Sequence, residues 1–150
     1  LLNSYFDVMV KEIIAQGGYV DKFIGDAIMA VFRGEYHLDR AIDASLAVRT
    51  KIEKLPALSK KFSPKVSIGI NSGEMISGNI GSANLKRLDY TVIGDTVNVA
   101  QRLQSAAREN QIIINEDSYK KVKDSFNCRL VGEVSLKNKT APVNLYEVMD

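Results

Sequence analysis

One tight turn signal constrains the fold of this chain more than any other feature. Gly25 and Asp26 separate two short β-like runs, residues 19–24 and 27–32, and such a pair between apolar runs is typical of a β-hairpin. Before them, residues 2–16 carry apolar side chains at helical spacing. A helix that leads directly into a hairpin predicts a fold that mixes helices with antiparallel strands.

The rest of the chain continues this mixture. A second helical pattern covers residues 39–58 with Asp39 as its expected N-cap. Asp95 and Thr96 are expected to cap a third helix, which runs to about Arg108. Further segments predict strands at 65–71, 74–80, 88–93, 111–115, 126–134 and 143–148, and a short helix at 116–124. No repeat or linker divides residues 1–150, so we expect one domain, an α+β sandwich with helices on one face of a mostly antiparallel sheet.

Composition excludes several classes of protein. The 150 residues are 45% hydrophobic and carry a net charge of +2, which fits a globular domain and is too small a charge to predict a nucleic-acid partner. The single cysteine, Cys128, cannot form an internal disulfide, so we expect a reducing, cytoplasmic setting. The chain begins inside a helical pattern without an initiator Met, and we therefore expect a fragment of a longer protein, with regulatory or sensor domains outside it.

Three stretches carry polar groups that suit chemistry. Asp26 lies at the hairpin turn, where its oxygens could bind a hard cation such as Mg²⁺, although Gly-Asp is also ordinary turn chemistry. Asn98 and Arg102 are four residues apart near a helix start, where they could hold a sugar hydroxyl and a phosphate, or simply form a solvated helix face. Lys22 and Lys137 could each bind a substrate or be exposed surface lysines.

Together these stretches resemble a known family. The segments are GYVDKFIGD at 18–26, IGINSGE at 68–74, GNIGS at 78–82 and DYTVIGDTVNVAQRL at 89–103. In this order they resemble the catalytic domain of class III adenylyl and guanylyl cyclases, over nearly the whole chain. The resemblance implies a ferredoxin-like or palm-like α+β fold, an antiparallel-rich sheet with helices packed on it, whose N-terminal strand and helix are missing here.

The resemblance also implies a role for each polar residue. Lys22 and Thr91 would select the purine, because an amine can donate to adenine N1 and a hydroxyl can accept from the 6-amino group, whereas guanine presents the opposite pattern. Guanylyl cyclases of the family typically have an acidic residue where this chain has Lys22. The other matches are Asn98 for the ribose, Arg102 for the α-phosphate, Lys137 for the terminal phosphates and Asp26 for the metal ions.

From these matches we predict a bacterial-type adenylyl cyclase that converts ATP to cyclic AMP and pyrophosphate. The family uses two divalent ions per site, Mg²⁺ or Mn²⁺, and the first metal aspartate would lie before Leu1. It works as a head-to-tail homodimer with shared sites, so Lys22 and Asp26 would serve different sites. Asn138 replaces a common family glycine, which leaves the choice of Lys137 over Lys139 open. The alternatives are a guanylyl cyclase and a catalytically silent nucleotide-binding module.

Overall fold

The predicted helix and hairpin are both present in the computed structural model, which describes residues 2–55, 65–74, 76–80, 89–134 and 142–150. Helix α1 (Leu2–Ala15) leads into strands β1 (Tyr19–Ile24) and β2 (Ala27–Val31), which pair antiparallel. In the turn between them Gly25 has φ 58°, a left-handed value that glycine adopts without steric cost. The turn signal in the sequence is therefore confirmed.

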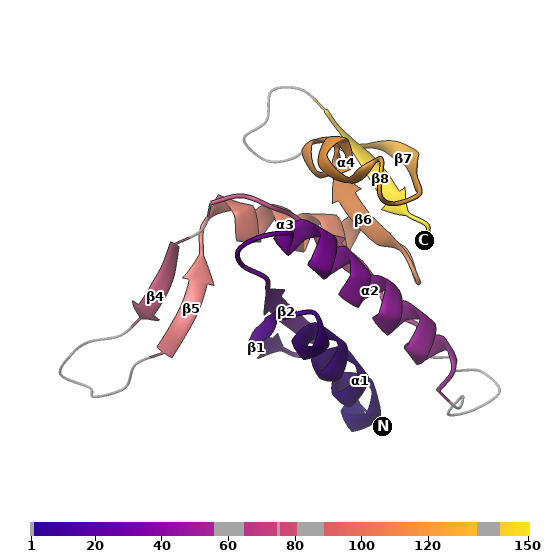
Figure 1. Ribbon diagram of the computed structural model, residues 1–150. Helices are drawn as coiled ribbons and strands as arrows, with labels where there is room; N and C mark the ends of the chain where they lie inside the picture. Colours follow the sequence, from indigo (N-terminus) through magenta and orange to yellow (C-terminus); the bar gives the residue numbers. More distant parts are fainter. Residues whose placement is uncertain (1, 56–64, 75, 81–88, 135–141) are drawn as a thin grey trace.

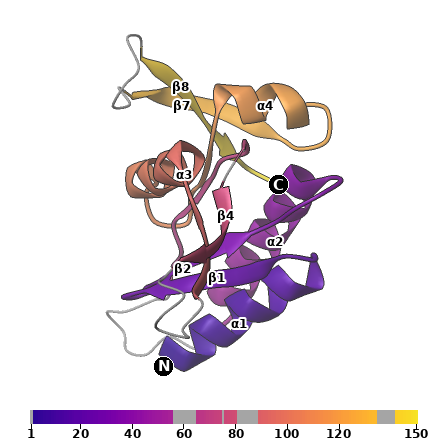
Figure 2. The ribbon, with the colours of Figure 1, turned by 90° about the vertical axis from the view of Figure 1, so that its left-hand side faces the viewer.

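A four-stranded sheet forms the centre of the molecule. Its strands, in spatial order, are β3 (Ile68–Ile70), β6 (Ile112–Asn115), β8 (Val143–Val148) and β7 (Cys128–Val134). Only the β3–β6 pair is parallel, and the other two pairs are antiparallel. The predicted antiparallel-rich α+β fold is confirmed, and Figure 2 shows β7 and β8 together with the short helix α4 (Glu116–Val122) beside them.

Helices cover both faces of this sheet, so the prediction of a single covered face is wrong. The reason lies in β6, where three consecutive isoleucines are all fully buried. Ile112 and Ile114 belong to the core formed with α2 (His37–Glu53) and α4, whereas Ile113 packs with Leu103 of α3 (Asp95–Ala106). A strand whose successive side chains point to opposite faces needs apolar cover on both.

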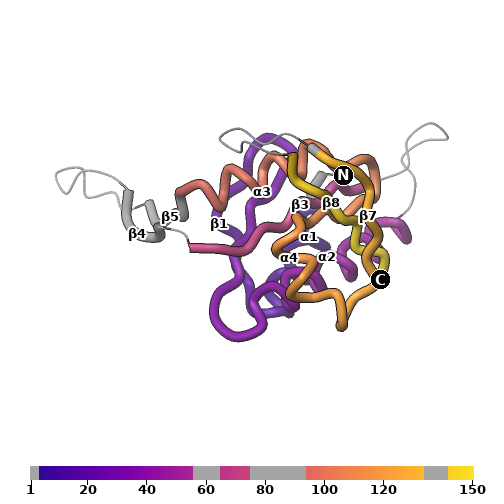
Figure 3. Tube along the Cα trace, turned by 90° about the horizontal axis from the view of Figure 1, so that it is seen from above, coloured from indigo at the N-terminus to yellow at the C-terminus, as the bar shows by residue number. Residues whose placement is uncertain are grey.

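Strands β4 (Ile76–Ile80) and β5 (Asp89–Ile93) pair with each other and not with the central sheet. Figure 1 shows this hairpin extending away from the rest of the fold, whereas the tube in Figure 3 shows how α3 lies over the central sheet. β5 contacts β1 and continues into α3. Ser72 and Gly73 therefore connect two separate sheets, since β3 pairs with β6 and β4 with β5.

The start of α2 differs from the sequence prediction. The helix begins at His37 after Tyr36, which has a left-handed φ of 56° and no side-chain cap, so Asp39 lies in the first turn and is not the N-cap. A carboxylate in that turn still interacts favourably with the helix dipole. The entry loop is held by Arg40, whose guanidinium donates to the carbonyl oxygens of Gln16, Arg33 and Glu35.

Candidate functional site

Asp26 occupies the exposed tip of the β1–β2 hairpin. Ile24 pairs with Ala27, which leaves Gly25 and Asp26 as the two loop residues. Among the described residues, no three His, Cys, Asp or Glu side chains gather where they could share a metal ion. Mg²⁺ typically needs only one or two protein carboxylates when substrate phosphates supply further oxygens, so an exposed turn aspartate fits the metal role that its sequence predicts.

Lys22 lies on β1 beside the carboxylate of Asp21, a residue for which the sequence predicts no role. Its Nζ is 3.5 Å from Oδ2 of Asp21, and the side chain of Lys22 is 41% exposed whereas that of Asp21 is completely buried. The strand register shifts between Val20 and Lys22, which makes Asp21 the extra residue of a β-bulge. Regular alternation would place consecutive side chains on opposite faces, so no signal in the sequence pattern indicated this pair.

Helix α3 carries Asn98 and Arg102 away from the face that packs on the sheet. Val99 and Leu103 face the core, with exposed fractions of 7% and 0%, while Asn98 is exposed and Arg102 half-buried. The helix begins at Asp95, with Gly94 as the residue before it and no side-chain cap, so the predicted capping by Asp95 and Thr96 is wrong. The amide and the guanidinium are thus fixed one turn apart on a helix that is packed on the sheet.

The loop after β3 fixes the first turn of α3. Nδ2 of Asn71 donates to the carbonyl oxygen of Thr96 (3.0 Å), and Oγ1 of Thr96 donates back to the carbonyl oxygen of Glu74 (2.7 Å). Asn115 of β6 supports Asn71 through a 2.9 Å side-chain hydrogen bond. These contacts fix the first turn of α3, which carries Asn98. The polar residues between two predicted strands are the only sequence signal for this loop.

The two remaining predicted residues are less completely described. Thr91 lies in the middle of β5, where its Cα is opposite that of Gly78 in β4. Lys137 lies outside the described residues, as does the alternative Lys139. The structure therefore places Lys22, Asp26 and Thr91 on two hairpins that touch through β1 and β5, and Asn98 on the helix that follows β5 directly.

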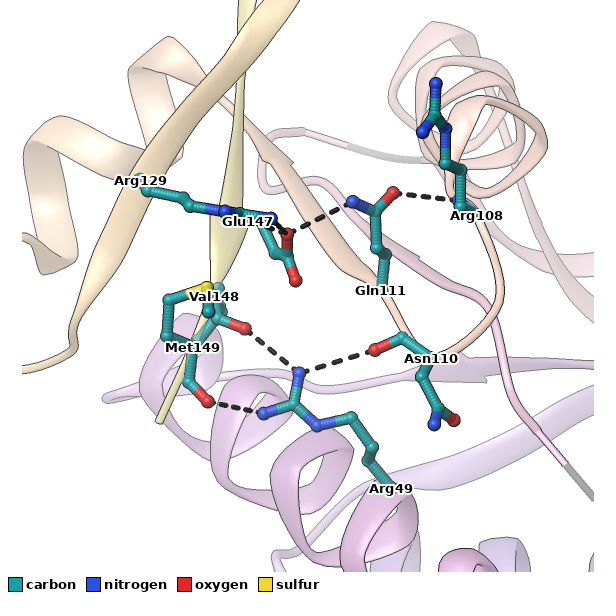
Figure 4. Close-up of polar contacts among 8 residues, drawn as sticks. All are labelled: Arg49, Arg108, Asn110, Gln111, Arg129, Glu147, Val148 and Met149. Carbon is teal, nitrogen blue, oxygen red and sulfur yellow. Dashed lines mark hydrogen bonds and ion pairs between the residues drawn. The ribbon is translucent and has the colours of Figure 1, made fainter.

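A second polar cluster, far from these residues in the chain, joins α2 to the C-terminal strand (Figure 4). Arg49 donates to the carbonyl oxygens of Asn110 and Val148, at 3.5 and 3.1 Å, and to that of Met149. A hollow of about 470 Å³ lies beside this arginine, and among the described site residues Lys22, Asp26, Asn98 and Arg102 do not line it. The guanidinium thus satisfies main-chain oxygens at the end of β8, a structural task.

In the same cluster the carboxylate of Glu147, only 7% exposed, accepts hydrogen bonds from Arg129 (2.9 Å) and Gln111 (3.1 Å). A buried carboxylate is tolerated when it is paired and hydrogen-bonded, and both conditions hold here. These contacts hold the C-terminal strand to the rest of the fold.

Comparison with known proteins agrees with this arrangement. Residues 1–149 match the family model described as the adenylate and guanylate cyclase catalytic domain. The chain belongs to this cyclase family. The family predicted from the four sequence segments is therefore confirmed. None of the described helices of the cyclase domain is long and apolar enough to span a bilayer.

Two curated relatives match nearly all of this chain but are much longer proteins. The terminal-differentiation-specific adenylate cyclase of Dictyostelium discoideum is 37% identical over 158 residues, which cover 99% of this chain and 7% of that protein. The adenylate cyclase of Anabaena cylindrica is 35% identical over 159 residues, with 98% of this chain and 31% of that protein covered. The chain thus spans less than a third of the length of either relative.

Solved structures of both nucleotide classes share the fold. The adenylyl cyclase CyaB from P. aeruginosa superposes with a TM-score of 0.83 at 32% identity, covering 99% of this chain and 80% of that one. The guanylate cyclase domain of RhGC from Catenaria anguillulae, in complex with GTP, gives 0.84 at 26% identity, covering 99% and 81%. Since the fold is common to both, the fold alone does not distinguish adenylyl from guanylyl cyclases.

Proposed function

We propose that this domain is an adenylyl cyclase, which converts ATP to 3′,5′-cyclic AMP and pyrophosphate at sites shared between two chains. The observation that carries the proposal is the amine of Lys22 on β1, partly exposed and beside the hairpin turn that holds Asp26. Both curated relatives described above are named adenylate cyclases, which supports the same choice.

Base selection would rest on Lys22 and Thr91. The ammonium donates to N1 of adenine, and the hydroxyl of Thr91 accepts from the 6-amino group. Guanine would present its N1–H to the ammonium, so that a buried donor would lose its partner at a cost of about 1–3 kcal/mol, equivalent to tenfold or more in selection. The contact between β1 and β5 is compatible with both residues reaching one base.

The sugar and phosphates would be held by residues of α3 and by a lysine that follows β7 in the sequence. Asn98 orients the ribose so that its 3′-oxygen faces the α-phosphorus, and Arg102 stabilises the charge that develops on the α-phosphate oxygens during in-line attack. Lys137, or Lys139 two residues later, contacts the terminal phosphates that leave as pyrophosphate. The four-residue spacing on one helix places the amide and the guanidinium one turn apart, which suits neighbouring ribose and phosphate groups.

Asp26 would hold the divalent ions, Mg²⁺ or Mn²⁺, two per site. Bound there, such ions lower the pKa of the ribose 3′-hydroxyl and neutralise phosphate charge. Regulatory or sensor domains outside these residues, a cytoplasmic setting and the absence of a nucleic-acid partner stay predictions.

The first experiment measures kcat/KM for ATP and GTP in the full-length protein, each with Mg²⁺ and with Mn²⁺. We expect ATP to be preferred, and we expect Lys22→Glu to reduce or reverse the preference because a carboxylate accepts from guanine N1–H. The matched control is Lys11→Glu, an exposed lysine of α1, which should leave the preference unchanged. A wild-type preference for GTP would favour a guanylyl cyclase, and turnover of neither nucleotide would favour a silent nucleotide-binding module.

The shared-site geometry has its own test. Neither Asp26→Ala nor Arg102→Ala should be active alone, because each removes a group from both sites of a homodimer. When the two variants are mixed, half of the dimers are heterodimers with one intact site each, so about one quarter of the wild-type activity should return. If the mixture stays at the level of the single variants, the head-to-tail arrangement is wrong.

A further inference from the structure

The β-bulge in β1 creates a side-chain pair that a regular strand would prevent. Val20 is opposite Ala30 and Lys22 is opposite Met29, so Asp21 is inserted between two consecutive ladder positions. In a regular strand the side chains of Asp21 and Lys22 would project from opposite faces. The bulge cancels that alternation, and the carboxylate and the amine come within 3.5 Å of each other.

The two members of this pair differ in their surroundings. The side chain of Asp21 is wholly buried, whereas 41% of the Lys22 side chain is exposed. A buried carboxylate has few orientations available, while a lysine has four flexible methylene groups and a strongly hydrated end. Asp21 is therefore the fixed partner, and its position restricts where the Lys22 ammonium can lie.

We propose that Asp21 is a positioning residue for purine selection, which holds the Lys22 ammonium beside the base and so favours ATP over GTP. The inference rests on the proposed function, in which Lys22 reads adenine N1. An ammonium has three donors, so one can remain on the Asp21 carboxylate while another reaches the purine. A held ammonium also cannot swing away from guanine N1–H, which strengthens discrimination against GTP.

The variant Asp21→Asn tests this directly, because it keeps the shape of the side chain and removes its charge. We expect the ratio of kcat/KM for ATP to that for GTP to fall about fivefold, the range for a charge-assisted contact that is half exposed to solvent. The loss should come mainly from ATP. The ratio compares two substrates on one protein preparation, so a smaller folded fraction does not change it.

The decisive comparison repeats Asp21→Asn in the Lys22→Gln background. If Asp21 acts through Lys22, the second substitution leaves the ratio of the Lys22→Gln protein unchanged. An equal loss for both nucleotides, or the same fivefold change in both backgrounds, would overturn the inference and indicate a structural role only. For variants too slow to assay, the relative affinities for non-cyclisable ATP and GTP analogues by equilibrium dialysis supply the same ratio.

The same four proteins separate failure of the inference from failure of the proposed function. If Lys22→Gln changes the nucleotide preference and Asp21→Asn does not, the role of Asp21 is wrong while Lys22 keeps its role. If Lys22→Gln itself leaves the preference at the wild-type value, Lys22 does not read the base, and both the base-selection scheme and the inference are wrong.

Discussion

Replacing Gly69 by alanine should displace the helix that carries Asn98 and Arg102. A Cβ at position 69 would lie 2.2 Å from the backbone nitrogen of Gln104 and 2.6 Å from the carbonyl oxygen of Ala100. Both atoms belong to the main chain of α3, so no side-chain rotation can relieve the overlap. Gly69 does not have a left-handed φ, and the substitution therefore tests the close approach of β3 and α3 by itself.

The size of the effect follows from these distances. Ordinary contact begins at 3.4 Å, so α3 must withdraw from β3 by about 1.2 Å. Overpacking of this kind typically costs about 1–3 kcal/mol of unfolding free energy. In a domain of this size each kcal/mol lowers Tm by about 2–4 °C, which predicts a fall of roughly 5 °C. Because a displacement of about 1 Å can cost a hundredfold in rate, we expect kcat/KM for ATP to fall by about that factor in the protein that remains folded.

The assay combines thermal unfolding with turnover well below the variant's Tm. The control is Gly34→Ala, where φ is +82° and no atom lies within 4 Å of the added methyl group. That control should cost about 1 kcal/mol through backbone strain and leave turnover unchanged. Wild-type stability and turnover in Gly69→Ala would refute the reasoning. They would mean that α3 accommodates the methyl group without losing packing energy or the position of Asn98 and Arg102.

Two further predictions concern charges outside the candidate site. Arg129→Met leaves the buried carboxylate of Glu147 with Gln111 but without its cation, and we expect the urea-derived free energy of unfolding to fall by about 1–3 kcal/mol, part of which Glu147→Gln should restore. Burial, and then the nearby charge of Asp39, raises the pKa of Asp43. Because the folded-state pKa is the higher one, ionisation of Asp43 opposes folding, and the cost appears as pH rises through the unfolded and then the folded pKa. Asp43→Asn should thus gain about 0.2–0.5 kcal/mol at neutral pH and almost nothing near pH 3, as urea titrations at the two pH values would show.

Local signals predicted the helices and strands well wherever one face of an element is buried. The apolar stripe of α1, the Gly25 turn and the strand that precedes α3 all follow from residues close together in the chain. The start of α2 was predicted less well, because Arg40 reaches carbonyl oxygens from as far back as Gln16 and holds the entry loop. The isoleucines of β6 marked a strand, but only the structure shows helices on both of its faces.

By itself, the order of residues determined the family, the mixed α+β class and the types of side chain that the chemistry requires, since these depend on local spacing and on chemical identity. Only the tertiary structure decided what holds those side chains in place. The close approach of Gly69 to Gln104 and the anchoring of Thr96 by Asn71 join segments that are distant in the chain, and no periodic pattern records their spacing. The contact of Asp21 with Lys22 joins consecutive residues, but it depends on a bulge that arises only when β1 pairs with β2. Strand pairing and helix packing thus decide all three contacts, and a change of one residue in strand register would move the side chains to the other face.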